Sequence, residues 1–334
     1  MTLRTRLTPA AASALQEIQA PVAGALEDVL REMKRIVASE TALVNSVSDH
    51  LMLMRGKMMR PTLLLLASET EGAPDAQATA YAAVVELIHL ATLVHDDAVD
   101  HSVLRRGMPT VNALFSHQVS VIMGDFLYSR ALLELVRLGN LERLEVLARA
   151  SNELTVGEIR QLAALDALAF SESDYELLIR AKTAALFAGA CEVGALCGAR
   201  VHRDAMRAYG TQLGMAFQVV DDLLDYTAST ATVGKPTGLD LKEHKATLPL
   251  IAAMPSMAPN ELTIVRELFQ TAQPSDELVS RVIEIVREQG GLDYARRRGE
   301  EYAQRAEEAL TDLPDNAAKT ALLDTVAYVM ERRS

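Results

Sequence analysis

VVELIHLATLVHDDAVD, residues Val84 to Asp100, joins an apolar helix to a cluster of carboxylates. On a helix, positions i and i+4 share a face, so Asp96 and Asp100 stack one above the other while Asp97 flanks them. Negative charge at a helix C-terminus is unfavourable, and a buried carboxylate without a partner is costly. The stretch therefore predicts a core helix that ends at a cation-binding site.

The same pattern recurs in LGMAFQVVDDLLD, residues Leu213 to Asp225. Asp221, Asp222 and Asp225 again follow an apolar run, so both sets of acids could point at a common cavity. Magnesium takes hard oxygen ligands and commonly bridges one or two carboxylates to the phosphates of a substrate. The repetition predicts a magnesium and polyphosphate site.

Composition predicts an all-α fold. The 334 residues are 49% hydrophobic and only 4% aromatic, and no proline occurs between Thr110 and Lys235. Leucine, alanine, glutamate and arginine dominate, and no segment shows sustained two-residue alternation. We expect a single helical domain over residues 1–334. The expected helices cover residues 10–38, 41–54, 57–70, 75–100, 116–138, 141–169, 172–198 and 202–226, followed by shorter ones.

Two segments are expected to lie outside this helical framework. Residues 1–10 form a flexible N-terminal segment in this interpretation. Residues 227–247 contain Gly234, Pro236 and Gly238 with several lysines, which is typical of a polar loop. That loop follows the second acidic motif and is expected to close over a ligand.

Charge and cysteine content narrow the function classes. A net charge of −12 argues against a nucleic-acid partner, which would need a basic stripe. No apolar run has the length and freedom from charge of a membrane span, so no stable membrane insertion is expected. Cys191 and Cys197 match neither a zinc pattern nor a disulfide framework. Free thiols and the absence of a signal-peptide pattern favour the cytoplasm over a targeted compartment.

Basic residues surround the two acidic motifs in the sequence and could neutralise a polyphosphate. A lysine inside an apolar helix, as at Lys182, is expected to face a ligand or an acid, because it is costly without either. The basic sets are RGKMMRP (residues 55–61, with Lys57 and Arg60), RRG (105–107), KT (182–183), and Lys235 with Lys245. Each set alone is more often surface charge, but their arrangement around two acidic motifs favours diphosphate binding.

Together these residues resemble the trans-isoprenyl diphosphate synthases over nearly the whole chain. Within the family the chain is most similar to the bacterial enzymes that form octaprenyl diphosphate. The motifs that carry the resemblance are ELIH (86–89), LVHDDAVD (93–100), RRGMPT (105–110), GDFLYSR (124–130), GE (157–158) with Gln161, KT (182–183), FQVVDDLLD (217–225) and ATLPL (246–250).

The resemblance implies an isoprenoid-synthase fold, which is one large helical bundle around a deep central cavity. It implies an enzyme that elongates an allylic diphosphate, preferably farnesyl diphosphate, with isopentenyl diphosphate and releases pyrophosphate. By similarity, Asp96, Asp100 and Asp221 hold magnesium, as three ions with bound diphosphate, and Asp97, Asp222 and Asp225 assist. A homodimer is also implied. The apolar helix from His117 to Leu138 could supply its interface or could equally belong to the core of one chain.

Substrate contacts follow from the same resemblance. The allylic diphosphate would be neutralised by Arg105, Lys182, Lys235 and Lys245, with hydrogen bonds from Thr183 and Gln218. Isopentenyl diphosphate would be anchored by Lys57, Arg60, His89 and Arg106. The proton released after the carbon–carbon bond forms would go to the departing pyrophosphate rather than to a side chain.

The chain departs from the family pattern in two places. Met58 stands where the family often has arginine after Gly-Gly-Lys, and His244 stands where it usually has glycine before the last lysine. Histidine resists backbone conformations that glycine tolerates, which puts the geometry beside Lys245 in question.

Product length is inferred from Ala91 and Thr92, the fifth and fourth positions before Asp96. In the family a bulky aromatic side chain there stops chain growth early, and here both residues are small. We expect a long product that supplies a quinone side chain. Overall resemblance favours eight isoprene units, with seven, nine or ten as the alternatives.

Other classes of protein remain as alternatives. A class I terpene cyclase shares one aspartate-rich motif, but its second metal motif differs from the one at Asp221 to Asp225. A non-catalytic regulatory subunit of a heteromeric prenyl synthase generally lacks some aspartates, and here all are present. A di-iron bundle needs two Glu-x-x-His motifs, and only Glu86 with His89 supplies one. A structural helical bundle would have no use for six such acids.

Overall fold

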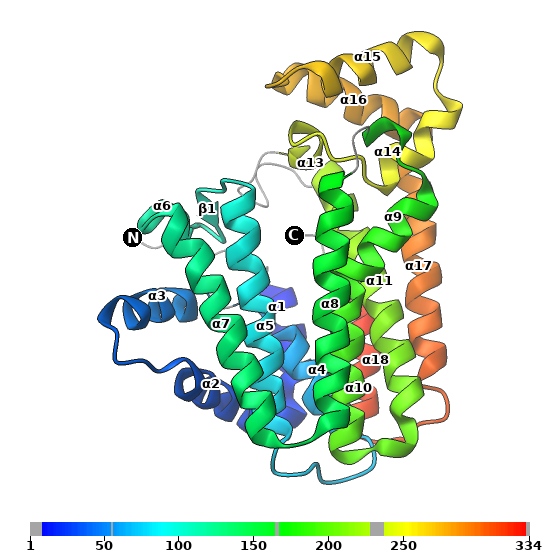
Figure 1. Cartoon of the computed structure of the whole chain (residues 1–334). Coiled ribbons are helices and arrows are strands. Elements are labelled where there is room, and N and C mark those ends of the chain that lie inside the picture. Colours follow the sequence, from blue (N-terminus) through cyan, green and yellow to red (C-terminus); the bar gives the residue numbers. More distant parts are fainter. Residues whose placement is uncertain (1–8, 55, 164–166, 228–236, 332–334) are drawn as a thin grey trace. The chain divides into compact units, whose positions relative to one another are not determined.

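The computed structural model describes residues 9–54, 56–163, 167–227 and 237–331. The described chain is helical almost throughout, as the sequence predicts (Figure 1). The first elements are α1 (Pro9–Gln19), η1 (Ala20–Val22), α2 (Ala23–Val37), α3 (Ala42–Leu53), α4 (Met59–Ser68), α5 (Ala78–Val99), β1 (Leu104–Arg105), β2 (Met108–Pro109), α6 (Val111–Leu114), α7 (His117–Leu138) and α8 (Leu141–Ala163). Then follow η2 (Ala167–Ala169), α9 (Glu172–Ile179), the π-helical turn η3 (Arg180–Ala184), α10 (Ala185–Gly198), η4 (Arg200–His202), α11 (Arg203–Thr227), α13 (Leu239–Lys242), α14 (Leu248–Ala253), η5 (Met254–Ser256), α15 (Pro259–Gln270), α16 (Asp276–Glu288), α17 (Gly291–Ala309) and α18 (Ala317–Met330).

The chain forms two compact units. Unit 1 comprises Met1–Ser151, Leu186–Gly210 and Leu310–Thr325, and unit 2 comprises Asn152–Ala185, Thr211–Ala309 and Val326–Ser334. The single domain expected from the sequence remains a prediction, and the two units are described separately below.

Helix α5 is the core of unit 1. It packs against α2, α4 and α7, and α7 runs beside it in Figure 1. Every residue from Tyr81 to Ile88 is buried, so this part of the helix is covered on all sides. Burial of each large aliphatic side chain contributes about 1.5–3 kcal/mol, and this apolar run therefore fixes the position of the carboxylates that follow it.

Helix α5 is also long and apolar enough to cross a membrane by length and composition alone. Two-thirds of its most apolar window, 67%, is buried inside the protein. The helix is therefore the core helix that the sequence predicts.

Helix α10 approaches α4 closely in unit 1. A Cβ atom added at Gly194 would lie 2.2 Å from the carbonyl oxygen of Leu64, and one at Gly198 would lie 2.0 Å from that of Ser68. Two glycines on one face of α10 thus allow the two backbones to touch, which no larger residue permits without displacement.

Unit 2 is organised around α14. This short helix contacts α9, α16 and α17, and α15 packs against α16. Gly291, at the start of α17, lies against the carbonyl oxygen of Pro249, where an added Cβ would be 2.2 Å away. Leu250, Val282 and Ile285 are fully buried in this unit.

Local structure departs from the expected helices at several places in the described chain. Residues 10–38 are interrupted by η1, which contains Pro21, because proline removes a backbone donor. Residues 104–109 form a hairpin that the sequence did not predict, in which Arg106 and Gly107 both have positive φ, as the tight turn requires. The expected loop 227–247 contains the helical turn α13, and residues 228–236 lie outside the described part of the chain.

Candidate active site

The candidate residues fall into two groups, one in each unit, and each group is considered by itself. Lys235 lies outside the described residues. Unit 1 holds Lys57, Arg60, His89, Ala91, Thr92, Asp96, Asp97, Asp100, Arg105 and Arg106. Unit 2 holds Lys182, Thr183, Gln218, Asp221, Asp222, Asp225 and Lys245.

The first acidic motif occupies the last turn of α5, and its three aspartates have different environments. Asp97 is 4% exposed, and Arg105 Nε donates to its two carboxylate oxygens at 2.8 and 3.0 Å. Burial raises the pKa of Asp97, and the Arg105 guanidinium opposes that rise. Asp96 is half-buried and Asp100 is exposed. Arg105 thus anchors the motif through Asp97, and the other two aspartates are the accessible ones.

A cationic cluster surrounds the buried carboxylate of Glu86. The Arg60 guanidinium lies 4.6 Å from the ring centroid of Phe187, in cation–π geometry. Burial lowers the pKa of Arg60 to about 10, so this arginine stays charged at neutral pH. Arg60 and Arg106 both oppose the burial that raises the pKa of Glu86. One carboxylate therefore faces two cations, which leaves the cluster positive and suited to an anion.

His89 adds a neutral hydrogen-bonding group to this cluster. Burial, followed by the charges of Arg60 and Arg106, holds the pKa of His89 well below its ordinary value of 6.5. The ring is therefore uncharged at neutral pH and can contribute one donor and one acceptor. The expected contact of His89 with a diphosphate would be a hydrogen bond and not an ion pair.

The segment before α4 brings the backbone close to Arg106. A Cβ atom at Gly56 would lie 2.6 Å from the guanidinium nitrogens of Arg106, so the glycine makes room for that side chain. Arg106 also donates to the carbonyl of Met54 at 2.8 Å. Met58, the departure from the family pattern, is buried and has φ +52, a conformation that favours glycine. Lys57 is half-buried beside it.

The residues expected to set product length lie one turn before the first acids. Ala91 is buried, and Thr92 is half-buried. The Thr92 hydroxyl donates to the carbonyl of His89 at 2.8 Å, so its polar group is satisfied within the helix. Neither side chain adds bulk at this level of α5.

In the second acidic motif, the middle aspartate is again the buried one. Asp222 is 5% exposed and accepts hydrogen bonds from the Tyr175 hydroxyl at 2.5 Å and from Gln218 Nε2 at 2.8 Å. Burial raises the pKa of Asp222 well above its ordinary range, and the nearby charges of Asp240 and Asp221 raise it further. Asp221 itself is exposed.

Asp225 anchors the chain that follows the motif. Its carboxylate oxygens accept from the backbone amides of Leu239 and Asp240 at 3.0 and 2.9 Å, at the start of α13. Its backbone carbonyl accepts from the Gly238 amide at 2.8 Å. Asp225 therefore caps α13, which places Asp240 beside the motif.

Asp240 was not among the residues singled out from the sequence. Burial, and then the charge of Asp225, raise the pKa of this carboxyl. Its only sequence signal was an acidic residue inside a loop rich in glycine and lysine. The structure adds it to the carboxylates that a cation in unit 2 would meet.

Lys182 and Thr183 lie in the π-helical turn η3, which the expected continuous helix over 172–198 did not include. The Lys182 ammonium is 2.8 Å from Glu158 Oε1 and donates to Gln161 Oε1 at 3.1 Å. The lysine therefore faces an acid, one of the two partners expected for it. Thr183 donates to Gln218 Oε1 at 2.6 Å. π-Helical turns often occur at functional sites, and no proline or glycine marks this one in the sequence.

Lys245 lies in a turn shaped by His244. The Lys245 amide donates to the carbonyl of Asp240 at 2.8 Å, and its ammonium pairs with Glu243 at 2.7 Å. His244 has φ +55, the left-handed conformation that glycine would adopt freely. Its Nε2 lies 3.0 Å from the carbonyl oxygen of Thr271, and its ring centroid lies 5.9 Å from that of Phe269.

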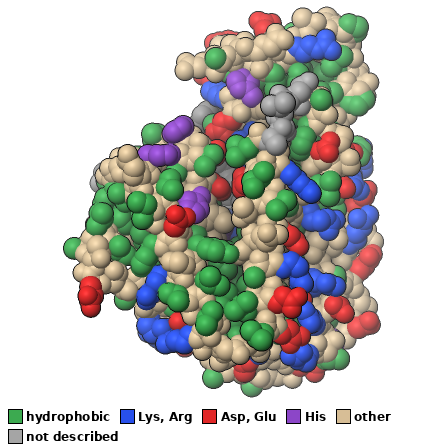
Figure 2. Space-filling model, viewed as in Figure 1, with side chains coloured by type: hydrophobic (Ala, Val, Ile, Leu, Met, Phe, Trp, Pro, Cys, Tyr) green, Lys and Arg blue, Asp and Glu red, His purple; other side chains and the backbone are tan. Residues whose placement is uncertain are grey.

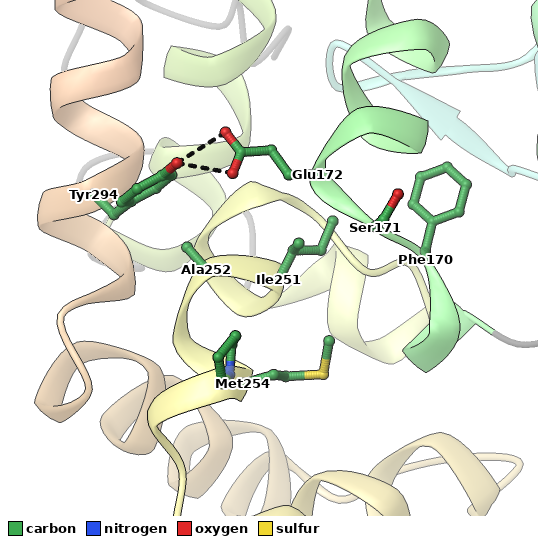
Figure 3. A pocket seen from close by; sticks show the side chains of 8 residues that line it. Phe170, Ser171, Glu172, Ile251, Ala252, Met254 and Tyr294 are labelled. Carbon is green, nitrogen blue, oxygen red and sulfur yellow. Dashed lines mark hydrogen bonds between the residues drawn. The ribbon is translucent and has the colours of Figure 1, made fainter.

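A cavity of about 430 Å³ also lies in unit 2 (Figure 3). Its lining is mainly apolar, and the Tyr294 hydroxyl points at the carboxylate of Glu172, to which it donates at 2.8 Å. The residues that line it are Phe170, Ser171, Glu172, Ile251, Ala252, Met254, Pro255 and Tyr294. None of them is a candidate site residue.

The carboxylates suit a magnesium ion that a phosphate helps to bind. Within the described ranges, no three His, Cys, Asp or Glu side chains form a group that could hold a metal by themselves. Asp96 and Asp100 in unit 1 and Asp221 in unit 2 offer hard oxygen atoms at half-buried or exposed positions. Magnesium commonly takes one or two carboxylates and completes its shell with water and phosphate oxygens. The carboxylates of each unit, taken by themselves, fit that coordination.

Comparison with known proteins gives consistent matches over most of the chain. Residues 41–286 match the protein family described as polyprenyl synthetase. The all-trans-nonaprenyl-diphosphate synthase (geranyl-diphosphate specific) of Rhodobacter capsulatus is 40% identical over 95% of this chain and 98% of its own length. The octaprenyl diphosphate synthase of Haemophilus influenzae is 36% identical over 96% and 97% of the two chains. The crystal structure of polyprenyl synthase from Caulobacter crescentus CB15, complexed with calcium and isoprenyl diphosphate, is similar with a TM-score of 0.90 and 36% identity over 96% of this chain and 98% of that one.

Proposed function

The chain belongs to the polyprenyl synthetase family of prenyltransferases, and from this we propose that it is a long-chain trans-polyprenyl diphosphate synthase. The family expected from the motifs and the all-α fold expected from composition are confirmed. The proposed reaction is the magnesium-dependent elongation of farnesyl diphosphate, or of another allylic diphosphate, with isopentenyl diphosphate.

The observation that carries the proposal is the retention of both complete acidic motifs. In each, the second aspartate is buried and held by protein donors, Asp97 by Arg105 and Asp222 by Tyr175 and Gln218. A non-catalytic subunit would have no need to keep all six carboxylates, two of which are buried at a cost to folding. The same retention disfavours a terpene cyclase, whose second motif has a different composition.

In the proposed reaction, magnesium would supply Lewis-acid assistance to the departing diphosphate when it is bound. The allylic carbon–oxygen bond breaks and its electron pair leaves with pyrophosphate. The double bond of isopentenyl diphosphate then supplies the electrons of the new carbon–carbon bond, and a proton passes to a pyrophosphate oxygen. The protein binds both diphosphates, holds the reacting carbons together and excludes water.

Unit 1 supports a site for isopentenyl diphosphate. Arg60 and Arg106 remain cationic beside the buried Glu86, and the neutral His89 adds a hydrogen bond. Two arginines are well suited to a diphosphate because their planar donor groups match its oxygens. Lys57 completes the proposed anion site.

Basic and polar side chains are proposed to bind the diphosphate of the allylic substrate. Lys182 is paired with Glu158 and Gln161 in the structure, and it would exchange these partners for the substrate. Arg105, Thr183, Gln218, Lys235 and Lys245 complete this set. Asp96, Asp100 and Asp221 are the proposed magnesium ligands.

We propose octaprenyl diphosphate as the product, for a quinone side chain. The small side chains of Ala91 and Thr92 support a long product. The two relatives named above form products of different length, nonaprenyl and octaprenyl diphosphate. Product size is therefore the property to measure first.

We also propose that the enzyme is a cytoplasmic homodimer. One face of α7 carries exposed apolar side chains, including Ile122, Leu133 and Val136 at 67%, 61% and 62% exposure. Figure 2 shows hydrophobic side chains gathered where α7 runs. An exposed apolar stripe of this kind is typical of a protein interface. Cys191 and Cys197 are buried free thiols, which suits a reducing compartment.

The test is to incubate the purified protein with farnesyl diphosphate, labelled isopentenyl diphosphate and magnesium, and to size the dephosphorylated products by reverse-phase chromatography. A dominant eight-unit alcohol is expected, and EDTA should abolish its formation. Asp96→Ala should lower the rate by at least about 100-fold. Mutation of residues that only support metal ligands already lowers metal affinity or activity by about 10–100-fold, and Asp96 is a proposed ligand itself.

The matched control is Asp49→Ala, which removes an exposed carboxylate of unit 1 outside the acidic motifs. It should leave both rate and product length unchanged. Products of another length would refute only the octaprenyl assignment. Cyclised hydrocarbon, or no incorporation by folded protein in the presence of magnesium, would refute the synthase itself.

A further inference from the structure

Three hydrogen bonds in unit 2 join a buried tyrosine to the proposed diphosphate site. The Tyr175 hydroxyl donates to Asp222 Oδ2 at 2.5 Å, and Gln218 Nε2 donates to Asp222 Oδ1 at 2.8 Å. The other end of the Gln218 amide, Oε1, accepts from the Thr183 hydroxyl at 2.6 Å. The chain of contacts therefore runs from Tyr175 through Asp222 and Gln218 to Thr183.

The surroundings of Asp222 differ from those of the other buried carboxylates. Glu192 pairs with Arg149 and Arg203, Glu134 with Arg35 and Arg137, and Asp97 with Arg105. Glu86 faces the charges of Arg60 and Arg106. For Asp222, the hydrogen-bond donors that the structure describes are the neutral groups of Tyr175 and Gln218. The carboxylates of Asp240 and Asp221 act on it electrostatically and disfavour its charge.

A buried carboxylate among other carboxylates is costly for folding alone. Its position is favourable once a cation binds nearby, which agrees with the proposed magnesium site. Tyr175 is 2% exposed, and its hydroxyl holds Asp222 Oδ2, the carboxylate oxygen that Gln218 does not contact. Without that hydroxyl, the carboxylate could rotate and the Gln218 amide would lose its fixed acceptor.

We propose that Tyr175 is a positioning residue of the diphosphate site, which orients Asp222 and, through Gln218, the hydroxyl of Thr183. The inference rests on the proposed function, in which Thr183 and Gln218 contact the allylic diphosphate. Tyr175 itself touches no substrate. Its effect is on affinity for the magnesium and diphosphate pair and not on the isopentenyl site.

The structure offers a closely matched control. Tyr302 is 3% exposed, belongs to the same unit, and donates its hydroxyl to the carboxylate of Glu176 at 2.5 Å. Tyr175→Phe and Tyr302→Phe therefore each remove a buried hydroxyl from a carboxylate of the same unit, and in Tyr302→Phe the carboxylate of Glu176 keeps its ion pair with Arg298. Any general loss of stability should be similar in both variants, and only the first should change the site.

The experiment measures binding of inorganic pyrophosphate with magnesium by calorimetry, and the KM of each substrate. Tyr175→Phe should weaken magnesium-dependent pyrophosphate binding, and raise the KM for the allylic diphosphate, by about tenfold, the loss expected for one hydrogen bond to a charged group. The KM for isopentenyl diphosphate should stay unchanged. Tyr302→Phe should leave all three quantities unchanged.

A double-mutant cycle tests the route through Thr183. In a Thr183→Val background, Tyr175→Phe should weaken pyrophosphate binding by much less than tenfold, because the group that it orients is already gone. Additive effects would contradict the route, and equal effects of the two tyrosine changes would show a merely structural role.

Failure of this inference and failure of the proposed function have different outcomes. If the wild-type protein binds pyrophosphate with magnesium and Tyr175→Phe binds it equally well, only the positioning role is refuted. If the folded wild-type protein binds no pyrophosphate with magnesium, both are refuted.

Discussion

At the scale of single residues, His244 shows how a side chain can compensate for an unfavourable backbone conformation. A non-glycine residue with φ +55 costs roughly 1–2 kcal/mol. The contacts of its ring with the Thr271 carbonyl and with Phe269 offset part of that cost. The sequence identified the departure from glycine but not the conformation or the compensating contacts.

This leads to a prediction on stability. His244→Gly and His244→Ala both remove the ring, but only alanine keeps the strain, so the alanine variant should be less stable by roughly 1 kcal/mol. Urea unfolding of both variants measures the difference. At Glu300, exposed on α17, the same pair of substitutions should give the opposite order, because the backbone there is helical. An alanine variant at position 244 as stable as the glycine variant would exclude strain at this position.

Sequence patterns singled out the aspartates of the candidate site together with Arg105 and Gln218, which hold two of them, but not Tyr175 or Asp240. Carboxylates that repeat at helical spacing after an apolar run can be recognised from a short stretch of sequence. Tyr175 is 47 residues away from Asp222 in the sequence, and nothing around it distinguishes a core tyrosine from a positioning residue. The same holds for Glu158, which was quoted in a motif without a role and proved to be the partner of Lys182.

At the scale of secondary-structure elements, the contact between α4 and α10 depends on the absence of side chains. Gly194→Ala would place a Cβ atom 2.2 Å from the carbonyl oxygen of Leu64, so one helix must move. We expect a loss of about 1–3 kcal/mol, the usual range for overpacking, measured by denaturant unfolding.

Gly299 provides the control for that prediction. It is also a buried glycine inside a helix, but the nearest atom to an added Cβ would be 3.5 Å away, at Val219. Gly299→Ala should therefore stabilise the protein by about 0.5–1 kcal/mol through helix propensity. Equal losses from both substitutions would contradict the packing explanation.

The existence of the helices could be predicted better than their interruptions. Apolar periodicity and the proline-free centre of the chain predicted the long helices correctly. Pro21 was visible in the sequence yet was placed inside one continuous helix, and the π-helical turn around Lys182 has no compositional signal. Such a turn depends on the packing of side chains from distant segments, which local patterns do not contain.

At the scale of the whole molecule, the exposed stripe on α7 leads to a prediction on assembly. If this face forms the proposed dimer, Leu133→Glu should convert the protein to a monomer, because a buried unpaired charge at an interface is costly. Sedimentation velocity at several protein concentrations measures the change. Leu53→Glu, at a 72% exposed leucine on α3, is the control and should leave the mass unchanged. An unchanged mass for Leu133→Glu would exclude this face as the interface.

The number of domains and the assembly were the hardest features to infer from sequence. Composition indicated a chain with enough apolar residues for one large core. In the structure the chain forms two compact units, and the stretches that build them alternate along the sequence. Segments of unit 1 come from three separate stretches of the chain, and their association depends on contacts between residues far apart in sequence.

The burial of α5 affects how much of the protein stays folded in the cell. This 22-residue helix is apolar enough to resemble a membrane-spanning segment, and it stays hidden only while α2, α4 and α7 cover it. A variant that loosens these neighbours would expose a segment that chaperones and proteases recognise as misfolded. Substitutions that loosen the cover of α5 should therefore reduce the amount of enzyme in the cell before they change its turnover.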